Sequence, residues 1–477
     1  MAFAALALFL SIAYVPFFAG DIAKWAVLFV SVGFLAFLPI RIDRIDLSAL
    51  AFVAWAWVSL LWSPDPMWGA VWGLKITTLA LLFIGLRRIE VPDWVVPLGV
   101  LGTLGMLFVA LYGSFQNENF TTEYLLVALP FLLVRRIYWP IAALVLTYLL
   151  WFNESLLEWV ALGAILLWGL WRWNRLIALV GALAGVAGVL SYYTGDSLWF
   201  RVDMWTDTLV MWTDAPLWGH GLGSFNYLYP WYETASPFGL EQFFNAQMWA
   251  VAAHNEYLQV LAELGTIGLA LAGFFVWQVR SLGERPPVAT AALVIAAALA
   301  FFESPLQHPG TGALVVLGFA MLTPRYAENV PKQWAIKSIG ATFSAAALVT
   351  AFFMAMGNWF YERADNIVDI DPQRALVEIV HAYNWFPADL LTRQIMFRYL
   401  VRLQTTVPAQ INYDLAEGMW QISKSAMPGH PQLLLDRIGY LSRVGRCEEE
   451  CGEIYQWLLR YAPHVGEVQR LKQEMEL

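Results

Sequence analysis

Residues 253–269, AHNEYLQVLAELGTIGL, set three polar side chains directly against an apolar run that continues to about Val276. An apolar segment of about 20 residues is long enough to span a bilayer as a helix. His254, Asn255 and Glu256 would then stand at the mouth of a membrane helix, where an ionisable residue is a candidate functional residue. The fold and sidedness of the chain decide what these residues face.

The composition is typical of an all-α polytopic membrane protein. Of the 477 residues, 59% are hydrophobic and 14% are charged, whereas a soluble domain has about 45–50% apolar and about 25% charged residues. Hydropathy predicts about 12–13 transmembrane helices. They are expected near residues 2–19, 22–40, 46–62, 68–86, 95–113, 121–134, 138–151, 156–171, 176–192, 257–279, 288–303, 310–324 and 338–357. The first lacks a basic n-region and a cleavage site, so it is predicted to be a retained span.

Basic residues predict the orientation of the chain. They fall on alternate connections, at Arg41/Arg44, Arg87/Arg88, Arg135/Arg136, Arg172/Arg175, Arg280/Arg285 and Arg325/Lys332/Lys337. Cytoplasmic loops carry an excess of Lys and Arg, which assigns these connections to the cytoplasm. The N-terminus is then cytoplasmic, and the loop 193–256 and the tail 358–477 are outside. The predicted domains are a transmembrane domain, 1–357, and an outer domain, 358–477.

Three cations of the membrane part stand apart from this pattern. Lys24 and Lys75 fall inside predicted spans toward their outer ends, and Arg201 lies in the long outer loop. Snorkelling would explain Lys24, and a surface salt bridge would explain Arg201. The alternative is that they bind an anionic substrate, since an intramembrane cation needs a reason.

Histidines and polar loops gather on the same outer face. His220, His254 and His308 map there, as do the polar segments 113–123 and 303–310. Histidine is the side chain whose charge changes near neutral pH. The sequence therefore predicts a site for a polar, anionic substrate at the outer edge of the bilayer.

The outer loop begins with a helical pattern and continues into a glycine-rich turn. One face of the helix carries Val202, Trp205, Leu209 and Trp212, as in a helix that lies at the membrane interface. Asp203 and Asp207 fall on the other side, where they could pair with Arg201. The turn GHGLGSF, residues 219–225, permits positive φ angles and amide hydrogens aimed at an anion.

The tail after Tyr361 is richer in charge and predicts short amphipathic helices. These are expected at 371–385, 388–404, 412–426, 431–444 and 447–461. Their pairing resembles the helix–turn–helix unit of tetratricopeptide arrays, with a repeat of about 34 residues. We expect a tetratricopeptide-like domain that binds a partner or acceptor. Asp369-Ile370-Asp371 precedes Pro372 and is interpreted as a helix cap rather than a metal motif.

Charge and cysteine content exclude some classes of protein. The net charge of −9 argues against a nucleic-acid partner, because no basic patch could neutralise phosphates. Cys447 and Cys451 are too few for a disulfide scaffold or, alone, for a zinc site. Their spacing of four fits either a disulfide or two free thiols on one helix face. No cofactor is expected.

Four segments resemble the O-antigen ligase and polymerase superfamily of GT-C-type membrane glycosyltransferases, which includes bacterial O-oligosaccharyltransferases. HNEYLQVLAELGTIGL (254–269) and RVDMWTDTLVMWTDAPLWGHGLGSFNYLYP (201–230) are similar to its signature region. NENFTTEYLLVALP (117–130) and FESPLQHPGTGAL (302–314) resemble its entries to other spans. The chain departs from the family pattern at two places. His220 stands in the turn where the family usually has a small or aliphatic residue. Asn153-Glu154-Ser155 stand between two middle spans where the family often has an arginine.

The resemblance implies glycan transfer from undecaprenyl diphosphate to an acceptor hydroxyl, such as a lipid A-core sugar, on the periplasmic face of the bacterial inner membrane. Such a reaction needs a base and cations for the leaving diphosphate. It is expected to need no metal. His254 is predicted to be the general base and Arg201 the principal diphosphate ligand, with Lys75 and Lys24 as further cations. Candidates for sugar or acceptor binding, or for orienting other residues, are Asn255, Glu256, His308, Gln307, Asn117, Asn119, Asp203, His220, Gly221 and Gly223. Glu263 is expected to pair with Lys75.

Other functions fit parts of the same pattern. A polysaccharide polymerase or a protein O-oligosaccharyltransferase would use the same donor. A zinc enzyme could draw on His220, His254 and His308. A transporter of lipid-linked sugars is a further alternative, although its polar sites would be expected at mid-membrane.

Overall fold

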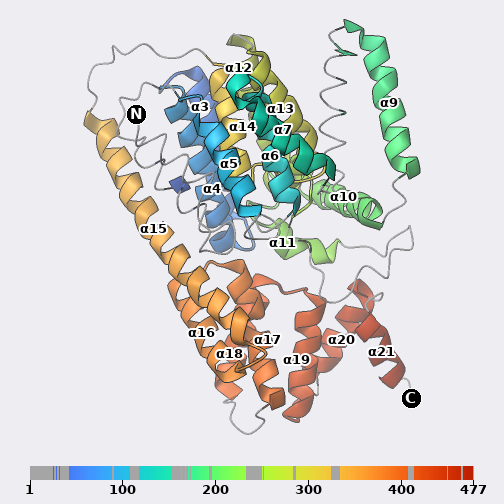
Figure 1. The fold of residues 1–477 in the computed structure, drawn as a ribbon. Helices are drawn as coiled ribbons and strands as arrows, with labels where there is room; N and C mark the ends of the chain where they lie inside the picture. Colours follow the sequence, from blue (N-terminus) through green and yellow to red (C-terminus); the bar gives the residue numbers. More distant parts are fainter. Residues whose placement is uncertain are drawn as a thin grey trace.

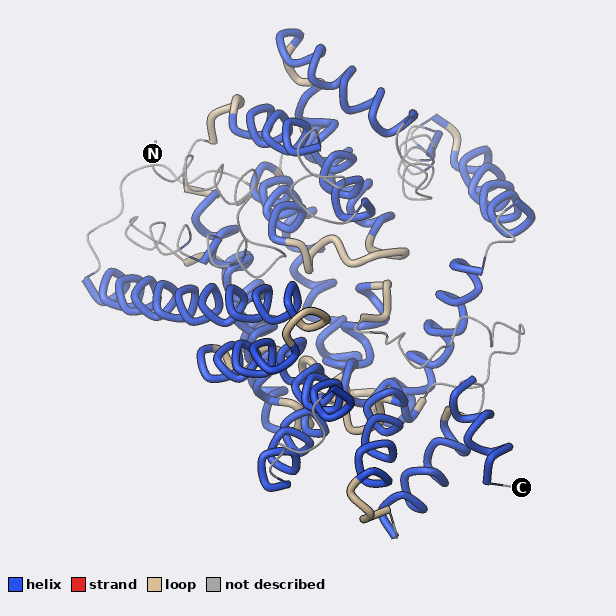
Figure 2. Tube along the Cα trace, turned by 60° about the horizontal axis from the view of Figure 1, so that its bottom comes forward, coloured by secondary structure: helices blue, strands red, loops and turns tan. Residues whose placement is uncertain are grey.

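The computed structural model describes most of the chain. The described residues are 25, 28–29, 32, 42–88, 91–107, 118–151, 163, 167, 170–171, 173–192, 196–232, 250, 252–282, 286–323, 334–406, 413–447, 449–462 and 466–475. Every secondary-structure element within these ranges is a helix (Figure 2). The predicted span 2–19 lies outside them, and 22–40 and 156–171 lie mostly outside them.

A bundle of apolar helices forms the larger part of the molecule (Figure 1). Its members are α3 (Arg44–Val58), α4 (Pro66–Leu86), α5 (Val95–Leu107), α6 (Glu118–Leu132), α7 (Trp139–Trp151), α12 (Glu256–Leu282), α13 (Pro287–Leu299) and α14 (Pro309–Met321). The short 3₁₀ helices Ser59–Leu61 and Arg136–Tyr138 follow α3 and precede α7, and α9 (Arg175–Tyr192) stands apart from the bundle. The core is centred on α6 and α14, where Tyr124, Leu125 and Leu314 are fully buried.

The described helices include segments that can cross a membrane. Arg44–Leu61, Pro66–Leu86 and Glu256–Ser281 are long and apolar enough, and four further apolar helices are shorter. The predicted all-helical membrane protein is confirmed at this level. The count of about 12–13 spans and their orientation stay predictions.

A charged cluster closes one end of the bundle. Arg87, at the end of α4, is almost fully buried and pairs with Asp46 at 2.5 Å and with Asp43 at 2.8 Å. Its Nε donates to Thr323 Oγ1 at 3.0 Å, next to the end of α14. Asp43 also caps α3. A buried charge is tolerated only when it is paired and hydrogen-bonded, so this cluster fixes three helix ends together.

Helix α12 is interrupted at Gly265, where φ is 68° and ψ is −173°. A Cβ at this position would lie 2.2 Å from the main-chain oxygen of Leu217, so a close approach requires glycine here. The interruption frees the N–H groups of Thr266 and Ile267 to bond Pro216 O and Leu217 O, at 2.9 and 3.1 Å. These hydrogen bonds hold the residues just before the glycine-rich turn against the interruption in α12.

The loop before α12 contains α10 (Asp196–Asp214), α11 (Phe225–Leu228) and the 3₁₀ helix η4 (Tyr229–Trp231). The face of α10 that packs inward carries Asp203 and Asp207, with Met204 and Met211. The predicted apolar face is partly exposed, with Leu209 42% exposed. The interfacial position of this helix stays a prediction.

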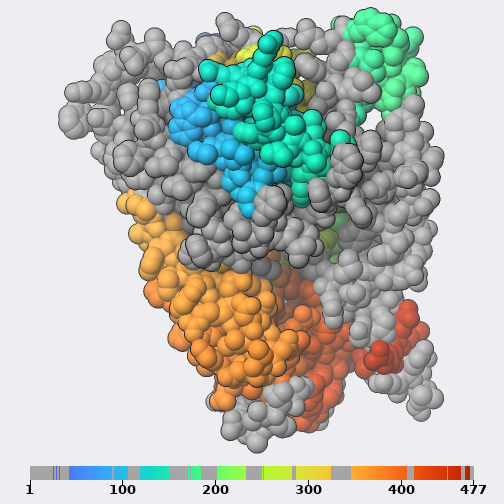
Figure 3. Space-filling model, in the orientation of Figure 1, coloured from blue at the N-terminus to red at the C-terminus, as the bar shows by residue number. Residues whose placement is uncertain are grey.

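The tail forms a second helical body (Figure 3). It contains α15 (Trp334–Ile367), α16 (Pro372–Trp385), α17 (Leu390–Thr406), α18 (Tyr413–Ala426), α19 (Pro431–Arg443), α20 (Glu449–Tyr461) and α21 (Gly466–Met475). Its core includes Phe397, Trp420 and Leu458. Helix α15 runs through the predicted boundary at 357/358 without a break, and α21 was not predicted. The tetratricopeptide-like repeat stays a prediction.

Two local features of this body involve residues that the sequence analysis discussed. Asp371 caps α16, because its side chain accepts from Arg374 N and Pro372 occupies the first turn, as the sequence predicts. Cys447 and Cys451 form a disulfide with a Cα–Cα distance of 5.2 Å. Of the two alternatives for these cysteines, the structure has the disulfide.

Candidate active site

One carboxylate joins the two residues that carry the predicted chemistry. Glu303, in the connection from α13 to α14, contacts Arg201 Nη2 through Oε1 at 2.5 Å. Its other oxygen, Oε2, lies 2.7 Å from His254 Nδ1. Glu303 is buried, Arg201 is 16% exposed at its side chain and His254 is 36% exposed. The structure thus brings His254 and Arg201 together around a residue that the sequence analysis did not single out.

His254 adopts an unusual backbone conformation, with φ at 46°. A non-glycine residue in this left-handed region costs about 1–2 kcal/mol and persists only when its surroundings fix it. Trp205 Nε1 donates to Ala253 O at 3.1 Å, and Gln259 Oε1 accepts from Ala253 N at 3.1 Å. On the other side, Asn255 Oδ1 accepts from Leu258 N at 3.1 Å and caps α12. The strained residue is therefore held firmly from both sides.

The surroundings of Glu303 decide the tautomer of neutral His254. Glu303 is buried, and the guanidinium of Arg201, whose Nη2 lies 2.5 Å from Oε1, favours the ionised form of this carboxylate. An ionised carboxylate can only accept a hydrogen bond, so His254 Nδ1 is the donor. In a neutral imidazole the lone pair then lies on Nε2, which is the atom a general base uses.

Arg201 uses only part of its donor capacity. A guanidinium carries five N–H donors, and Glu303 engages Nη2. Within the described part of the chain, the buried Nε has no hydrogen-bond partner. Asn119 Nδ2 lies 3.5 Å from the same Glu303 oxygen that Arg201 contacts. The guanidinium can therefore bind a second anion.

The glycine turn binds an anion that belongs to the protein itself. Gly221 and Gly223 have φ angles of 95° and 76°. The amides of Gly223 and Phe225 donate to the carboxylate of Glu263, at 2.9 and 3.2 Å, while Gly221 N donates to the main-chain oxygen of Glu263 at 2.8 Å. This differs from the expected pairing of Glu263 with Lys75, because the Gly265 interruption brings the turn against Glu263. Gly221 and Gly223 thus have a structural partner where a substrate contact was predicted.

Lys75 lies among three tryptophans. Its Nζ is 4.0 Å from the ring centroid of Trp72, 5.5 Å from that of Trp25 and 5.8 Å from that of Trp68. Tryptophan is the strongest aromatic partner of a cation. Trp25 Nε1 in turn donates to Gln307 O at 3.1 Å. The ammonium is therefore held beside the connection from α13 to α14 that carries Glu303.

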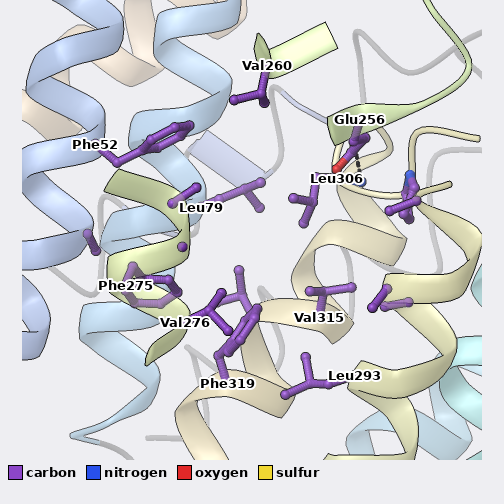
Figure 4. A pocket seen from close by; sticks show the side chains of 18 of the residues that line it. Phe52, Leu79, Glu256, Val260, Phe275, Val276, Leu293, Leu306, Val315 and Phe319 are labelled. Atoms are coloured by element: carbon purple, nitrogen blue, oxygen red, sulfur yellow. Dashed lines mark hydrogen bonds between the residues drawn. The ribbon is translucent and has the colours of Figure 1, made fainter. Parts of the chain in front are cut away.

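A cavity of about 1290 Å³ runs between α3, α4, α12, α13 and α14. Figure 4 shows its largely apolar wall, with Phe52, Leu79, Phe275 and Phe319, and Glu256 bonded to the Leu306 amide. Its polar lining includes Lys75, Glu256, Gln259, Glu263 and Gln307, and at another point Arg280. His254 and Arg201 do not line it, but Glu256 and Gln307 belong to the same two segments as His254 and Glu303. The cavity is therefore an apolar space that adjoins the charged cluster.

The other predicted residues take varied positions. Glu256 Oε1 accepts from Leu306 N at 2.8 Å, and Gln307 Nε2 donates to Gln259 Oε1 at 3.2 Å. His308 stacks on Phe120, with ring centroids 3.6 Å apart. His220 Nε2 lies 2.8 Å from Met211 O.

Asp203 is buried on α10. Lys24 and Asn117 lie outside the described residues. Within the described ranges, no three His, Cys, Asp or Glu side chains group as a metal site.

Sequence reasoning missed Glu303 and Gln259. Glu303 was quoted inside the polar segment 303–310, and its position at the end of an apolar helix was the available signal. Gln259 lies one turn after Asn255 and bonds both Ala253 N and the side chain of Gln307. Its position in a membrane helix was a comparable signal.

Comparison with known proteins bears on this region. No curated protein and no solved structure matches the chain. Residues 124–273 match the family model described as O-antigen ligase. The matched segment contains Arg201, the glycine turn, His254 and the interrupted helix α12 up to Gly273. The match supports the resemblance seen in the motifs: residues 124–273 of this chain are similar to the O-antigen ligase family.

Proposed function

We propose that the protein is an O-antigen ligase-like glycosyltransferase. It would transfer a glycan from undecaprenyl diphosphate to an acceptor hydroxyl, with a lipid A-core sugar as the leading acceptor. The reaction would take place on the periplasmic face of the bacterial inner membrane, with the N-terminus in the cytoplasm. The family match supports a glycosyltransferase of the ligase or polymerase type. The observation that carries the finer proposal is the cluster of His254, Glu303 and Arg201.

In this mechanism His254 is the general base. Its Nε2 takes the proton of the acceptor hydroxyl while the hydroxyl oxygen attacks the anomeric carbon of the glycan. The bond between that carbon and the diphosphate oxygen breaks, and the undecaprenyl diphosphate leaves with the electron pair. The proton stays on His254 as imidazolium, which Glu303 stabilises through Nδ1, and is then released to water.

Arg201 and Lys75 are proposed to bind the diphosphate. The leaving group gains charge as the glycosidic bond breaks, so a cation in place before the reaction lowers the barrier. The planar fork of arginine matches phosphate oxygens, and the unengaged donors of Arg201 suit this role. Lys75 adds a second positive charge beside the same connection.

The apolar cavity suits the lipid of the donor. A polyprenyl chain is stabilised when its surface leaves water or packs in a fitted apolar space. The polar lining at Glu256, Gln259 and Gln307 lies on the segments that hold His254 and Glu303. The polyprenyl chain could therefore lie among α3, α4, α12 and α14 while the diphosphate reaches Arg201.

Purified protein in detergent, given undecaprenyl-diphosphate glycan, tests the proposal against its alternatives. Transfer to a lipid A-core acceptor is expected. Extension of the glycan would instead identify a polymerase, and transfer to a serine or threonine peptide a protein O-oligosaccharyltransferase. A lasting loss of activity after treatment with a chelator, restored by added zinc, would favour a zinc enzyme. An absence of turnover in detergent, where there is no second compartment, would favour a transporter.

Variants test the two central residues. His254→Ala is expected to lower kcat by about 10²–10⁴-fold, the usual contribution of a general base. Arg201→Ala should also abolish transfer while the protein stays folded. His381→Ala, an exposed histidine of α16, is the matched control and should keep full activity. Wild-type activity in His254→Ala or Arg201→Ala would remove that residue from the mechanism.

A further inference from the structure

The start of α4 is a point where the helical tail reaches the membrane bundle. Asp65 accepts a hydrogen bond from Trp68 N at 3.2 Å and caps α4. Its other oxygen, Oδ2, pairs with Arg393 Nη2 of α17 at 2.7 Å. Both side chains are buried, 4% and 5% exposed. Figure 1 shows the body of α16–α18 at this end of the bundle.

Trp68 connects this pair to the cation in the cavity. On one side it packs against Leu390, Ala426 and Met427 of the tail. On the other it meets the ring of Trp72 edge-on at 5.9 Å and lies beside Lys75. A single side chain therefore touches both the tail and the tryptophan cage around Lys75.

The same turn of α4 also supports the glycine-rich segment. A Cβ at Gly69 would lie 2.3 Å from Leu222 O, so α4 and the segment are in direct main-chain contact here. Ser63 Oγ donates to Leu222 O at 3.0 Å. Movement at the start of α4 would therefore disturb both the Lys75 cage and the turn that holds Glu263.

We propose that Arg393 is a positioning residue through which the C-terminal helical domain sets the affinity for the donor lipid. It acts through Asp65 and Trp68 on Lys75. The inference rests on the proposed function in one respect, the assignment of Lys75 to the diphosphate. A buried carboxylate that loses its partner must take up a proton or move toward water. Without Arg393, Asp65 would therefore cap α4 less well and Trp68 would lose its fixed place.

The first experiment needs no activity. Hydrogen exchange is measured on residues 70–75 of the full-length protein for Arg393→Ala and for Arg402→Ala. Arg402 lies on the same helix α17 but pairs with Asp369 at an exposed site. Loss of a helix cap changes exchange by about fivefold, the equivalent of about 1 kcal/mol. Faster exchange in Arg393→Ala alone supports the proposal, and unchanged exchange overturns it.

The second experiment measures KM for the donor and kcat separately. Arg393→Ala is expected to raise the donor KM about tenfold with kcat changed less than threefold, and Arg393→Lys should recover most of the loss. In a Lys75→Met background, Arg393→Ala should change KM less than twofold, because its effect passes through Lys75. Multiplicative effects of the two changes, or a loss confined to kcat, would overturn the proposal.

The two experiments also separate this inference from the proposed function. If the wild-type protein transfers no glycan while Arg393→Ala still loosens residues 70–75, the proposed function fails and the mechanical link stands. If transfer is intact and the exchange is unchanged, only the positioning role fails. Should Arg393→Ala not fold, Arg393→Gln, which keeps most of the side-chain volume but removes the charge paired with Asp65, carries both measurements.

Discussion

Glu303→Gln is the sharpest test of the site. Glutamine keeps the size and planarity of glutamate but removes its charge. Its side-chain oxygen can still accept from His254 Nδ1 or from Arg201 Nη2, which lie 2.7 and 2.5 Å from the two glutamate oxygens. The change therefore preserves packing while it removes the carboxylate that would stabilise a protonated His254.

The expected magnitude follows from the geometry. Two unit charges about 4 Å apart at an effective dielectric constant of about 20 attract each other by about 4 kcal/mol. His254 is 36% exposed, so water screens its interaction with Glu303. We therefore take about half of this value, about 2 kcal/mol, as the attraction between the carboxylate and protonated His254. If the charge acts on the imidazolium of the transition state, kcat falls about 30-fold, since about 1.4 kcal/mol corresponds to a factor of ten.

The assay is single-turnover transfer at saturating donor, with thermal unfolding as a check on the fold. Glu453→Gln, an exposed position of α20, is the matched control and should be unchanged. Glu303→Asp should also be impaired, because a side chain shorter by one methylene cannot hold both partners. A single-turnover rate constant within threefold of wild type in a folded Glu303→Gln protein would show that the carboxylate does not assist His254.

Two further predictions concern the fold. Gly265→Ala should destabilise the protein by about 3 kcal/mol, from the positive φ and the overlap with Leu217 O. Gly273→Ala on the same helix, whose Cβ would meet nothing within 4 Å, should be tolerated, and equal melting temperatures would contradict this. Burial and then the charge of Arg398 lower the pKa of His430 to about 3. The unfolded chain takes up this proton below about pH 6.5, so stability falls as pH drops toward 3, by about 2 kcal/mol between pH 7 and 5. The protection factors of amides 431–443, which correct for the slower intrinsic exchange at low pH, should fall accordingly in the wild-type protein and stay constant in His430→Asn.

Short-range features of the structure could be predicted from the sequence. Apolar runs of helical length became α3, α4 and α12, because a bilayer requires that length and polarity. The cap at Asp371 and the positive φ angles of the glycine turn depend on neighbouring residues alone. A spacing of three and four also predicted that Asp203 and Asp207 lie on the opposite side of α10 from Leu209, although it did not predict that this side packs inward.

Long-range partners could not be predicted in the same way. Asp65 and Arg393 are separated by 328 positions, and no local pattern links them. Glu263 stood in a motif, but its partners come from the turn at 223–225, which reaches it only because α12 is interrupted at Gly265. The carboxylate that joins His254 to Arg201 lies 49 positions after one and 102 after the other.

The two buried carboxylates near His254 differ in a way that bears on mechanism. Glu263 is held by main-chain amides and Gln259, all neutral, so the arrival of a charged substrate gives it no reason to change partners. Glu303 is shared between a guanidinium and an imidazole. A diphosphate that binds the unengaged donors of Arg201 would share the positive charge of the guanidinium with Glu303, and the carboxylate would then interact more strongly with His254. In the proposed reaction, binding of the donor diphosphate would therefore strengthen the interaction of Glu303 with His254. His254 is the base that takes the proton from the acceptor hydroxyl. Since that coupling requires one carboxylate to reach both partners, Glu303→Asp should weaken it even when His254 and Arg201 are intact.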